Sequence, residues 1–542
     1  MRERSNAKRG GMSTVTKVAV GLILFACVFL PLIRMFTHFS ADSAREVLES
    51  GRFFPALINS ITLTLIATVI VLVLAYLLAW CVERTDMKLK GMFNVILVLP
   101  MLIPSISHGM GLIILFGQNG ILTNLLGLEN SIYGSVGIIT GSVMYAFPVA
   151  YIMLSDVLRY EDRTVYEAAD VLGIGRVRQI LKITLPYMRK PLITAAFSTF
   201  SLIVTDYGVP LMIGGKTKTV SLLMYEEVIG QLDFGRGCFY GLVLLIPAIV
   251  AFITDLFNKD RASSAFVKKG DTRRVATGLN VFATVVCILV LLFALLPIGA
   301  FLIVGFAEKY PTDMIPTFKN LLTTLSKGGG EYLKNSLVIA IVTSLLGTVL
   351  AYITAYLTAR MRSPLSKLLH LMVLTFMAIP GIVLGLSYVM TFSGSFISGT
   401  IVILIMVNTA HFISSPYLMM YNSFGKMNEN LEAVGTTLGI SRVRMLKDVF
   451  LPQSFGTALE MFSYLFVNCM MTISAVAFLY SRSTKPISLM ITQFEAQAQY
   501  EYAAIVSLLI LAVNILMKAV IGILKRRATR YGRKNKLIKD GK

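Results

Sequence analysis

The chain combines a high apolar content with a strong positive charge, and this combination excludes most classes of protein. Its 542 residues are 56% hydrophobic and only 15% charged, the formal net charge is +21, and the mean hydropathy is +0.74. About a quarter of the residues in soluble domains are charged. A chain this apolar cannot bury all of its nonpolar surface in the core of a protein surrounded by water. The five cysteines are scattered without a close pair, which excludes a disulfide framework and a zinc knuckle. The composition therefore predicts a polytopic membrane protein.

Apolar stretches long enough to cross the hydrocarbon core recur along the chain. A helix needs roughly 20 apolar residues to span about 30 Å of hydrocarbon. Twelve stretches meet this length, so we expect an all-α polytopic membrane protein of about 12 transmembrane helices. In chain order the predicted spans are 18–37, 56–82, 92–117, 132–157, 191–213, 238–257, 277–304, 333–359, 368–393, 397–420, 455–480 and 502–524.

The distribution of Lys and Arg sets the orientation of these spans. Basic residues accumulate in loops on the cytoplasmic side of membrane proteins. If all twelve stretches cross and the N-terminus is cytoplasmic, the segments on that side hold 37 of the 50 Lys and Arg residues. These segments are 1–17, 83–91, 158–190, 258–275, 360–367, 421–454 and 525–542. The lipid bilayer thus explains the basic charge without a nucleic-acid partner, and we expect both termini in the cytoplasm.

An alternative interpretation makes the first apolar stretch a cleavable signal peptide, because a basic run precedes it. Its removal would reverse the parity of the remaining spans and place the most basic loops outside the cell. We therefore keep this stretch as a membrane span.

Two halves of the chain repeat each other. Asn59-Ser60 recurs as Asn335-Ser336 at an offset of 276 residues, and Pro104 with Gly109 recurs as Pro380 with Gly385 at the same offset. Parallel repeats of this kind enclose a pathway around an axis along the membrane normal. The organisation we expect is a first repeat over 1–257, a cytoplasmic basic linker over 258–276, a second repeat over 277–524 and a basic tail over 525–542.

Two long cytoplasmic loops, about 158–190 and 421–454, follow the fourth span of each half and match each other. Leu172-Gly173-Ile174 returns as Leu438-Gly439-Ile440 at an offset of 266, and each loop closes on Leu-Pro. In the first loop Glu167-Ala168-Ala169 favours a helix, and Gly173 suits the left-handed residue that ends one. A short helix–Gly–helix element is marginal alone in water, so we expect a partner to support it.

These residues resemble the EAA coupling loop in the permease subunits of binding-protein-dependent ATP-binding-cassette (ABC) importers. The likeness extends over the whole chain, since two such permeases fused end to end give this length and this repeat. It implies the type I ABC importer permease fold, with a coupling helix in each loop that docks in a groove of an ATP-hydrolysing subunit. The second copy departs from the pattern, because Ala433 stands where the first copy has Glu167, and Glu432 precedes it.

The resemblance also implies partners and coupling residues. We expect a dimer of ABC ATPase subunits at the cytoplasmic loops, an extracellular or periplasmic solute-binding protein, and a place in the bacterial inner or plasma membrane. Closure of the ATPase subunits would rock the two halves, so that a central cavity faces each side in turn. The residues expected to couple the subunits are Glu167, Ala168, Ala169, Gly173, Arg176, Arg178, Glu432, Ala433, Gly439, Arg442 and Arg444.

Two further stretches of sequence indicate which solute the protein transports. The fused twelve-span form resembles the permeases of ferric iron and of 2-aminoethylphosphonate. The stretch 205–210 followed by Gly214-Gly215, and the stretch 472–480, resemble the phosphonate branch more closely. We therefore expect 2-aminoethylphosphonate or a related phosphonate, with ferric iron as the alternative.

The sequence motifs favour no enzymatic or metal-binding activity. Gly215-Lys216-Thr217 lacks the glycine that a phosphate-binding loop needs five residues earlier, where Pro210 stands. The four histidines form no His-Glu-x-x-His motif. We expect no catalytic residue, no metal and no cofactor bound by this chain, with ATP used by the partner subunit. A secondary transporter of the major-facilitator kind is the alternative class, although it has no need of the repeated loop.

Candidates for the transport pathway come from ionisable and helix-breaking residues inside the spans. Titratable groups are costly in a membrane, so Asp206, His108 and His411 are functional candidates. Pro104 and Pro380 each remove a helical hydrogen bond and are candidate hinges of the third and ninth spans. The alternatives are an interfacial Asp206, histidines that hydrogen-bond to neighbouring helices, and prolines that kink their helices without motion.

Overall fold

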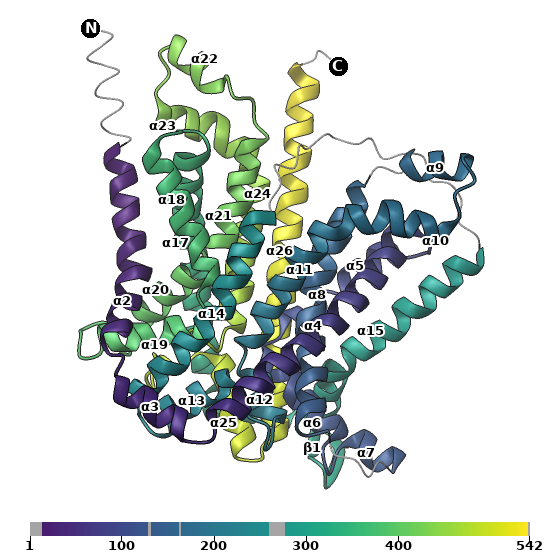
Figure 1. Cartoon of the computed structure of the whole chain (residues 1–542), viewed down its shortest axis with the longest axis vertical. Helices are drawn as coiled ribbons and strands as arrows, with labels where there is room; N and C mark the ends of the chain where they lie inside the picture. The colour runs from purple at the N-terminus through teal and green to yellow at the C-terminus, as the bar shows by residue number, and fades with distance from the viewer. Residues whose placement is uncertain (1–13, 128–131, 162–163, 259–276, 540–542) are drawn as a thin grey trace. The chain divides into compact units, whose positions relative to one another are not determined.

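The structure of the protein is a computed structural model, and it describes residues 14–127, 132–161, 164–258 and 277–539. Helices make up nearly all of this part of the chain (Figure 1). Two described strands, β1 (Ala307–Lys309) and β2 (Asp313–Pro316), form one short antiparallel hairpin. The predicted all-α class is therefore confirmed. Residues 259–276 of the predicted linker lie outside the described residues.

Most of the predicted membrane spans coincide with long apolar helices. Eight helices of the described chain are long and apolar enough to cross a membrane, and the number rises to ten if each of two bent pairs is one span. The bent pairs are Pro364–Ala378 with Gly381–Phe392, and Ile401–Phe412 with Ser414–Gly425. The predicted spans 191–213 and 455–480 are not among the ten. They overlap α11 (Leu185–Val204) and α24 (Leu451–Met471), and their crossing stays a prediction.

The described residues pack into two compact units, and each unit takes segments from both halves of the chain. One unit, called the N unit, comprises the described parts of Ser40–Thr324 and Ile491–Leu508. The other, the C unit, comprises the described parts of Met1–Phe39, Leu325–Met490 and Leu509–Lys542. The first span, Thr14–Thr37, thus packs with the second half of the chain, and α15 (Thr277–Gly305) packs with the first half.

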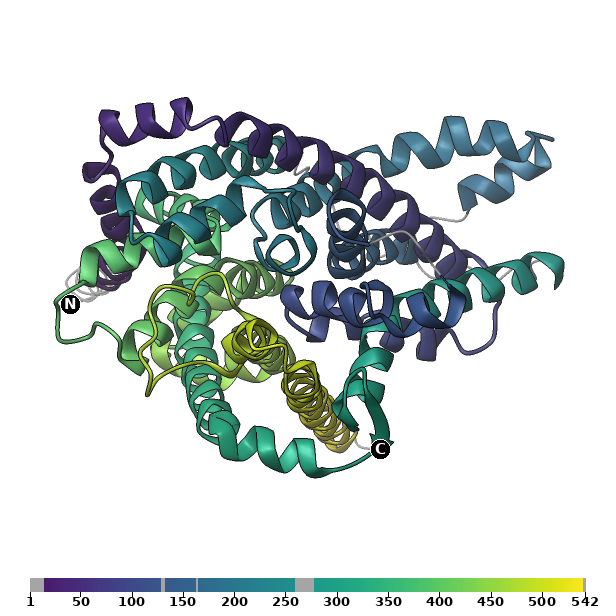
Figure 2. The same ribbon diagram turned by 90° about the horizontal axis from the view of Figure 1, so that it is seen from below.

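The N unit is built around the long helix α4 (Phe53–Arg84), which packs against α8 (Ser135–Tyr160), α11 and α15 (Figure 2). Ala67, Ala75 and Ala79 of α4 are fully buried, because small residues let neighbouring membrane helices approach closely. The other helices of this unit are α3 (Ala41–Glu49), α5 (Lys90–Ile96), α6 (Ser105–Phe116), α7 (Ile121–Leu126), α9 (Thr164–Val171), α10 (Arg176–Gln179), α12 (Gly208–Ile213), α13 (Val220–Gly230), α14 (Phe234–Asn258) and α16 (Lys319–Thr324).

The C unit is built around α17 (Gly330–Ala359), which packs against α21 and α24. Ala351 and Ala355 are fully buried, and a Cβ on Gly347 would lie 2.9 Å from Leu465 Cδ1, so this helix also uses small residues for close packing. The other helices of this unit are α2 (Leu30–Thr37), α18 (Pro364–Thr375), α19 (Gly381–Phe392), α20 (Ile401–Phe412), α21 (Ser414–Gly425), α22 (Leu431–Thr437), α23 (Arg442–Met445) and the part of α26 (Tyr500–Lys539) after Leu508. α25 (Met490–Ala496) from Ile491 onward and α26 up to Leu508 belong to the N unit.

The Asn-Ser pair of the first half connects α4 to the loop that follows the fifth predicted span. Asn59 Nδ2 donates a hydrogen bond to Lys218 O (3.2 Å). Ser60 Oγ accepts one from Val220 N (2.8 Å), at the start of α13. Both bonds satisfy backbone groups at a helix entry, where they would otherwise lack a partner.

The Asn-Ser pair of the second half makes the equivalent connection from α17. Asn335 Nδ2 donates to Ser483 O, and Ser336 Oγ accepts from Ile487 N, both at 2.8 Å. The loop bound here again follows the fifth predicted span of its half. The repeat in the sequence therefore reflects one structural role that is present in both units.

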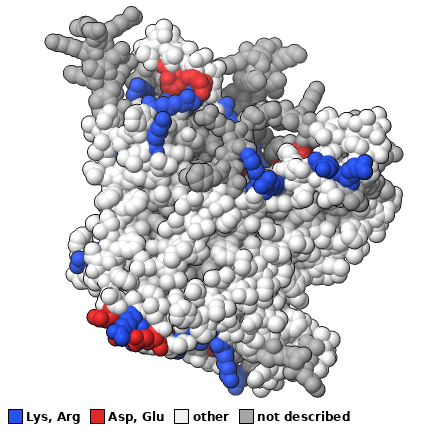
Figure 3. All heavy atoms as spheres, viewed as in Figure 1, with Lys and Arg blue, Asp and Glu red and all other residues white. Residues whose placement is uncertain are grey.

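Charged side chains gather near the ends of the helices. On the face drawn in Figure 3, blue and red atoms gather in a few patches, and wide areas of the described surface are white. A surface with few charges is what the apolar interior of a bilayer requires. The arrangement agrees with helices that cross a membrane and carry their polar groups outside it.

Candidate functional site

The first of the two repeated loops folds as two short helices joined by a glycine. α9 (Thr164–Val171) is followed by Gly173, whose φ of +69° lies in the left-handed region that favours glycine. Ile174 N donates to Ala169 O (2.9 Å), which satisfies a carbonyl group of the helix end. α10 (Arg176–Gln179) then leads through one turn of π-helix into α11. The predicted helix–Gly–helix element is confirmed.

The second loop follows the same backbone path. α22 (Leu431–Thr437) is followed by Gly439 with a φ of +72°, and Ile440 N donates to Gly435 O (2.8 Å). α23 (Arg442–Met445) then leads through a turn of π-helix into α24. The two loops therefore share the helix, the left-handed glycine, the second helix and the π turn in the same order.

The predicted coupling residues divide by exposure. Ala169 is buried and Glu432 is half-buried. The side chain of Arg176 lies outside the description. The exposed members are Glu167, Ala168, Gly173, Arg178, Ala433, Gly439, Arg442 and Arg444. Most of the predicted surface is therefore accessible to another protein, and the role of each residue stays a prediction.

Both loops also expose large apolar side chains. Leu172 is 75% exposed, and Leu438, its counterpart at the offset of 266, is 69% exposed. Val171 and Val443 are exposed to 88% and 74%. Apolar side chains grouped on exposed elements with polar surroundings are typical of contact surfaces for other proteins. The two loops thus have the character of docking surfaces.

An arginine at the end of α4 holds the first loop. Arg84 forms an ion pair with Glu161, and both side chains are largely buried. Tyr166 on α9 donates its hydroxyl to Glu161 Oε1 (2.6 Å), and the Arg84 guanidinium lies over the Tyr166 ring, 5.1 Å from its centroid. Burial raises the pKa of Tyr166, so its hydroxyl keeps the proton that it donates. These contacts fasten the start of α9 to the end of α4.

Arg360, directly after α17, holds the second loop. Its guanidinium donates to both carboxylate oxygens of Glu432 at 2.6 Å, which is a bidentate ion pair. It also donates to the backbone oxygens of Met427 (3.1 Å) and Asn428 (2.7 Å) and lies 5.3 Å from the ring centroid of Phe450. Because the Arg360 side chain is only 5% exposed, these contacts are shielded from water.

Sequence patterns did not single out Arg84 or Arg360. The two residues stand 276 positions apart, which is the offset of the Asn-Ser repeat, so the repeat contained a signal for them. Their acidic partners carry no such signal, since Glu161 and Glu432 occupy different positions of the repeat. The ion pairs become visible only when the loops are folded against the helices.

Asp206 lies at the break between α11 and α12, and its carboxylate accepts hydrogen bonds from the first turns of α6 and α12. Oδ1 accepts from Ser105 Oγ (2.5 Å) at the start of α6, and Oδ2 accepts from Val209 N (3.0 Å) at the start of α12. The carboxylate therefore caps α12 and holds the start of α6 at the same point. A small cavity opens beside it, with the polar lining residues Ser60, Thr64, Ser142, Asp206, Thr219 and Ser221. A role for Asp206 in the pathway stays a prediction.

His108 and His411 have different surroundings. His108 is fully buried in α6 with its ring edge-on to Tyr145, and neither ring nitrogen hydrogen-bonds to a described residue. His411 is half-buried near the end of α20, where a Cβ on Gly381 would lie 3.0 Å from its Nε2. No described group of three or more His, Cys, Asp or Glu side chains is arranged to hold a metal ion. The part of either histidine in transport stays a prediction.

Pro104 and Pro380 stand at breaks in their predicted spans. Pro104 directly precedes α6, and Pro380 lies at a bend of 105° between the helices before and after it. A Cβ on Gly109 would lie 2.8 Å from Met212 Cβ, and a Cβ on Gly385 would lie 2.8 Å from Ala475 O, so each glycine packs against the end of the fifth predicted span of its half. The repeated Pro and Gly thus combine a helix break with close packing. Both prolines therefore stand at helix breaks, and hinge motion at them stays a prediction.

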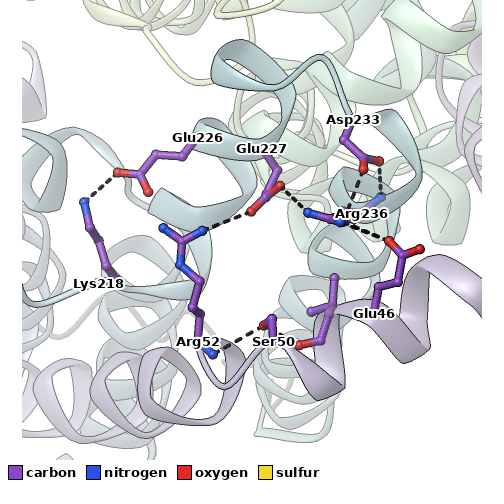
Figure 4. A network of polar contacts seen from close by, with 9 residues as sticks. Glu46, Ser50, Arg52, Lys218, Glu226, Glu227, Asp233 and Arg236 are labelled. Carbon is purple, nitrogen blue, oxygen red and sulfur yellow. Dashed lines mark hydrogen bonds and ion pairs between the residues drawn. The ribbon is translucent and has the colours of Figure 1, made fainter.

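A network of ion pairs joins the helices of the N unit at the other end of α4 (Figure 4). Glu227 on α13 is nearly buried and contacts Arg52 at 3.7 Å and Arg236 at 3.4 Å. Arg236 also pairs with Glu46 of α3 (3.0 Å) and with Asp233 (3.2 Å). These contacts connect α3, α13 and α14 to the start of α4 at this end of the unit.

One protein-family model matches the chain twice. The family is described as "Binding-protein-dependent transport system inner membrane component", and the matches cover residues 72–259 and 345–530. The helical units and the repeated loop define a membrane component of a transport system with two copies of one permease repeat. The chain belongs to this family of binding-protein-dependent inner-membrane transport components.

Relatives of the chain are transport permeases. The ferric transport system permease protein FbpB of Actinobacillus pleuropneumoniae is 21% identical over 93% of this chain and 78% of its own length. The Fe(3+)-transport system permease protein FbpB 2 of Haemophilus influenzae is 23% identical over 90% of this chain and 94% of its own length. The molybdenum transport system permease protein ModB of Azotobacter vinelandii is 31% identical over 31% of this chain and 78% of its own length.

These matches decide between the two predicted classes of transporter. They confirm a fused permease of a binding-protein-dependent ABC importer, and they show that the major-facilitator alternative is wrong. The two long relatives are named for ferric iron, which was the alternative solute from the sequence. None of the three relatives is named for a phosphonate, so the preferred solute gains no support from them.

Proposed function

We propose that the chain forms the membrane pathway of an ABC importer and couples it to ATP hydrolysis in a separate subunit. The observation that carries this proposal is the helix–glycine–helix loop, present twice with the same backbone path and with exposed apolar side chains. A short helix of this kind fits a groove on a partner protein. Each loop would engage one subunit of an ATPase dimer, and ATP would be bound there and not by this chain.

The coupling surface consists of the outward residues of the two loops. Glu167, Ala168 and Ala433 lie on the first helix of their loops, where small side chains allow close approach to a groove. Arg178 and Arg444 are exposed on the second helices and suit acidic groups at the rim of that groove. Arg84 and Arg360 pass the movement of the loops to α4 and α17, because they bind both.

We place both loops and both termini in the cytoplasm, in the inner membrane of a bacterium. The support is the concentration of 37 of the 50 Lys and Arg residues in the segments assigned to that side. The solute-binding protein then docks on the opposite face, where the ion-pair network of Figure 4 stiffens the N unit. The helix breaks at Pro104 and Pro380 are where the pathway would change shape during transport.

For the solute we propose ferric iron. The support is that the two relatives matching about nine-tenths of this chain are named for ferric transport. 2-Aminoethylphosphonate is the second candidate, because the stretches 205–210 and 472–480 resemble phosphonate permeases. Solute selection lies mainly with the separate binding protein in such systems, so the two candidates are separated by experiment on the whole importer.

Substitution of the loop glycines tests the coupling role. A β-branched residue at Gly173 and Gly439 strains the left-handed backbone by about 1–2 kcal/mol at each site, so Gly173→Val with Gly439→Val should weaken ATPase binding at least tenfold. Gly175→Val is the matched control, because this glycine has no positive φ and a Cβ added to it would meet no atom within 4 Å. Unchanged ATPase association and unchanged uptake in the double variant would contradict the proposal.

Reconstitution tests the solute. The chain is assembled in liposomes with its ATPase and its binding protein, and ATP-dependent uptake of ferric iron and of 2-aminoethylphosphonate is compared. We expect the binding protein to retain ferric iron and uptake to require ATP. Retention and uptake of the phosphonate without iron would replace the solute while keeping the transporter class.

A further inference from the structure

The arginines that hold the two loops use acids from different positions. Arg84 pairs with Glu161, which precedes α9, whereas Arg360 pairs with Glu432 in the first turn of α22. At the offset of 266, Glu432 aligns with Tyr166, the residue whose ring lies under Arg84 in the first loop. Glu432 therefore stands at the arginine-binding position of its loop and not at the position of Glu167.

The contacts of Glu432 leave its carboxylate little capacity to bind another protein. Both carboxylate oxygens accept from Arg360 at 2.6 Å, and the Glu432 side chain is 25% exposed. Removal of this acid from the pair would leave the buried guanidinium of Arg360 without its counter-ion, which is strongly unfavourable. The pair is therefore expected to stay closed while a partner docks.

Glu167 has the opposite character. It is exposed on α9, and the structure gives its carboxylate no hydrogen bond or ion pair with a described residue. Its counterpart in the second loop is Ala433, which is exposed and uncharged, and α22 contains no acid besides Glu432. The exposed Glu429 precedes α22 and pairs with the exposed Arg362 at 3.0 Å.

We infer that the two docking surfaces for the ATPase differ in charge. The first offers the exposed carboxylate of Glu167 to a basic side chain of the partner, and the second docks through apolar and uncharged contacts while Glu432 serves Arg360. Glu432, Arg84 and Arg360 are then positioning residues that fix the angle of each docking helix. The inference rests on the proposed function, which supplies the ATPase as the partner.

The partner-dependent part is tested by binding measurements on the full chain in nanodiscs with its purified ATPase. Glu167→Gln should lower the affinity about tenfold at low salt and much less at about 0.5 M salt, because an interfacial charge pair is screened. Glu429→Gln is the matched control, an exposed acid of the second loop, and should change the affinity by less than about twofold. An equal, salt-dependent loss for Glu429→Gln or for Glu432→Gln would overturn the inference.

The positioning part is tested without the ATPase, by amide hydrogen exchange of the full chain. Arg360→Gln and the double variant should raise exchange in residues 421–454 by the same amount, because Glu432 acts there through Arg360. Glu432→Gln alone should raise it less, since Arg360 still donates to Met427 O and Asn428 O. Glu167→Gln should leave exchange in 158–190 unchanged. Additive effects of Arg360→Gln and Glu432→Gln would show that they do not act as one pair and would overturn this part.

The two experiments separate failure of the inference from failure of the proposed function. If Gly173→Val with Gly439→Val and Glu167→Gln all leave ATPase binding intact, the proposed coupling role is wrong, and the exchange result for Arg360 and Glu432 still stands. If the glycine variant loses binding while Glu167→Gln and Glu432→Gln weaken it equally and with the same salt dependence, the coupling role stands and the difference between the surfaces is wrong.

Discussion

The two repeated loops share a backbone path while differing in the side chains that fill it. In the second loop the two short helices meet at Gly435 and Met445, and the equivalent positions of the first loop hold Ala169 and Gln179, both buried. A Cβ on Gly435 would collide with Met445 Sδ, so the larger partner occupies the space that the glycine leaves. The comparison teaches that the two repeats keep the total side-chain volume at this place, although both residues differ between them.

The two loops hold an arginine at equivalent positions, but its acidic partner comes from a different position in each loop. Arg84 and Arg360 are equivalent in the repeat, and each is clamped between the end of a long helix and its loop. Glu161 and Glu432 reach their arginine from different points of the chain. A buried arginine needs a counter-ion close by, but several backbone positions can supply it. The loops are thus alike in mechanics and unlike in surface charge.

Among the substitutions that test this comparison, Arg360→Gln is expected to have the largest effect on transport and on the stability of the second loop. The change leaves Glu432 and two backbone oxygens without their donor, and loss of one partner of a largely buried ion pair costs about 3–5 kcal/mol. We expect ATP-dependent uptake to fall at least tenfold and the second loop to become sensitive to trypsin. Arg362→Gln removes only an exposed pair with Glu429 and is the control. Similar behaviour of the two variants would mean that Arg360 does not hold the loop.

The next effect concerns the packing of the short helices. Gly435→Ala should destabilise the second loop by about 1–2 kcal/mol through overpacking against Met445, and Met445→Ala in the same chain should restore it. Hydrogen exchange of residues 421–454 measures both changes. Ala169→Gly in the first loop meets no such partner and should cost about 1 kcal/mol through backbone entropy alone. Failure of Met445→Ala to rescue Gly435→Ala would break the volume argument.

Substitution of the serine in each Asn-Ser pair should lower the stability of the protein by a smaller amount, and equally in the two halves. Ser60→Ala and Ser336→Ala each remove one buried acceptor of a backbone N–H group, at a cost of about 1 kcal/mol. The thermal midpoint of the purified chain should fall by similar amounts in the two variants. Clearly unequal shifts of the thermal midpoint would show that the two Asn-Ser pairs match in sequence but do not stabilise the two halves equally.

The smallest effect is expected from the exposed arginines of the second helices. Arg178→Gln and Arg444→Gln should each weaken ATPase binding by less than about threefold, because exposed charges contribute little. Arg444 already pairs with Asp448 at 3.3 Å, so its loss should be the smaller of the two. A loss of tenfold or more from either variant would assign it a central contact in the docking groove.

Features that depend on local sequence were predictable, and features that depend on long-range contacts were not. Apolar length gave the long helices, and offsets of 276 and 266 gave the repeat, the helix breaks at Pro104 and Pro380 and the left-handed glycines. The sequence did not predict that Thr14–Thr37 packs in the C unit and α15 in the N unit, because hydropathy says nothing about which helix packs against which.

The exposed residues of the two loops were also predicted in part. The exposed members of both loops follow from a local motif, so they were found in the sequence. The pairing of Glu432 with Arg360 was not, because the two residues are 72 positions apart and the acid is not repeated in the first half. The motif alone therefore assigned Glu432 to docking, whereas the structure shows it bound within the chain.

Cross-linking from the exposed leucines tests the central claim most directly. Leu172→Cys and Leu438→Cys are each labelled with a photoreactive thiol probe in membranes that contain the ATPase, with Cys27 replaced by serine because the other native cysteines are buried. Leu125→Cys on α7, 74% exposed, is the control. We predict that both loop positions cross-link to the ATPase and that the control does not. Transport-competent chains without a cross-link from either loop would contradict the account.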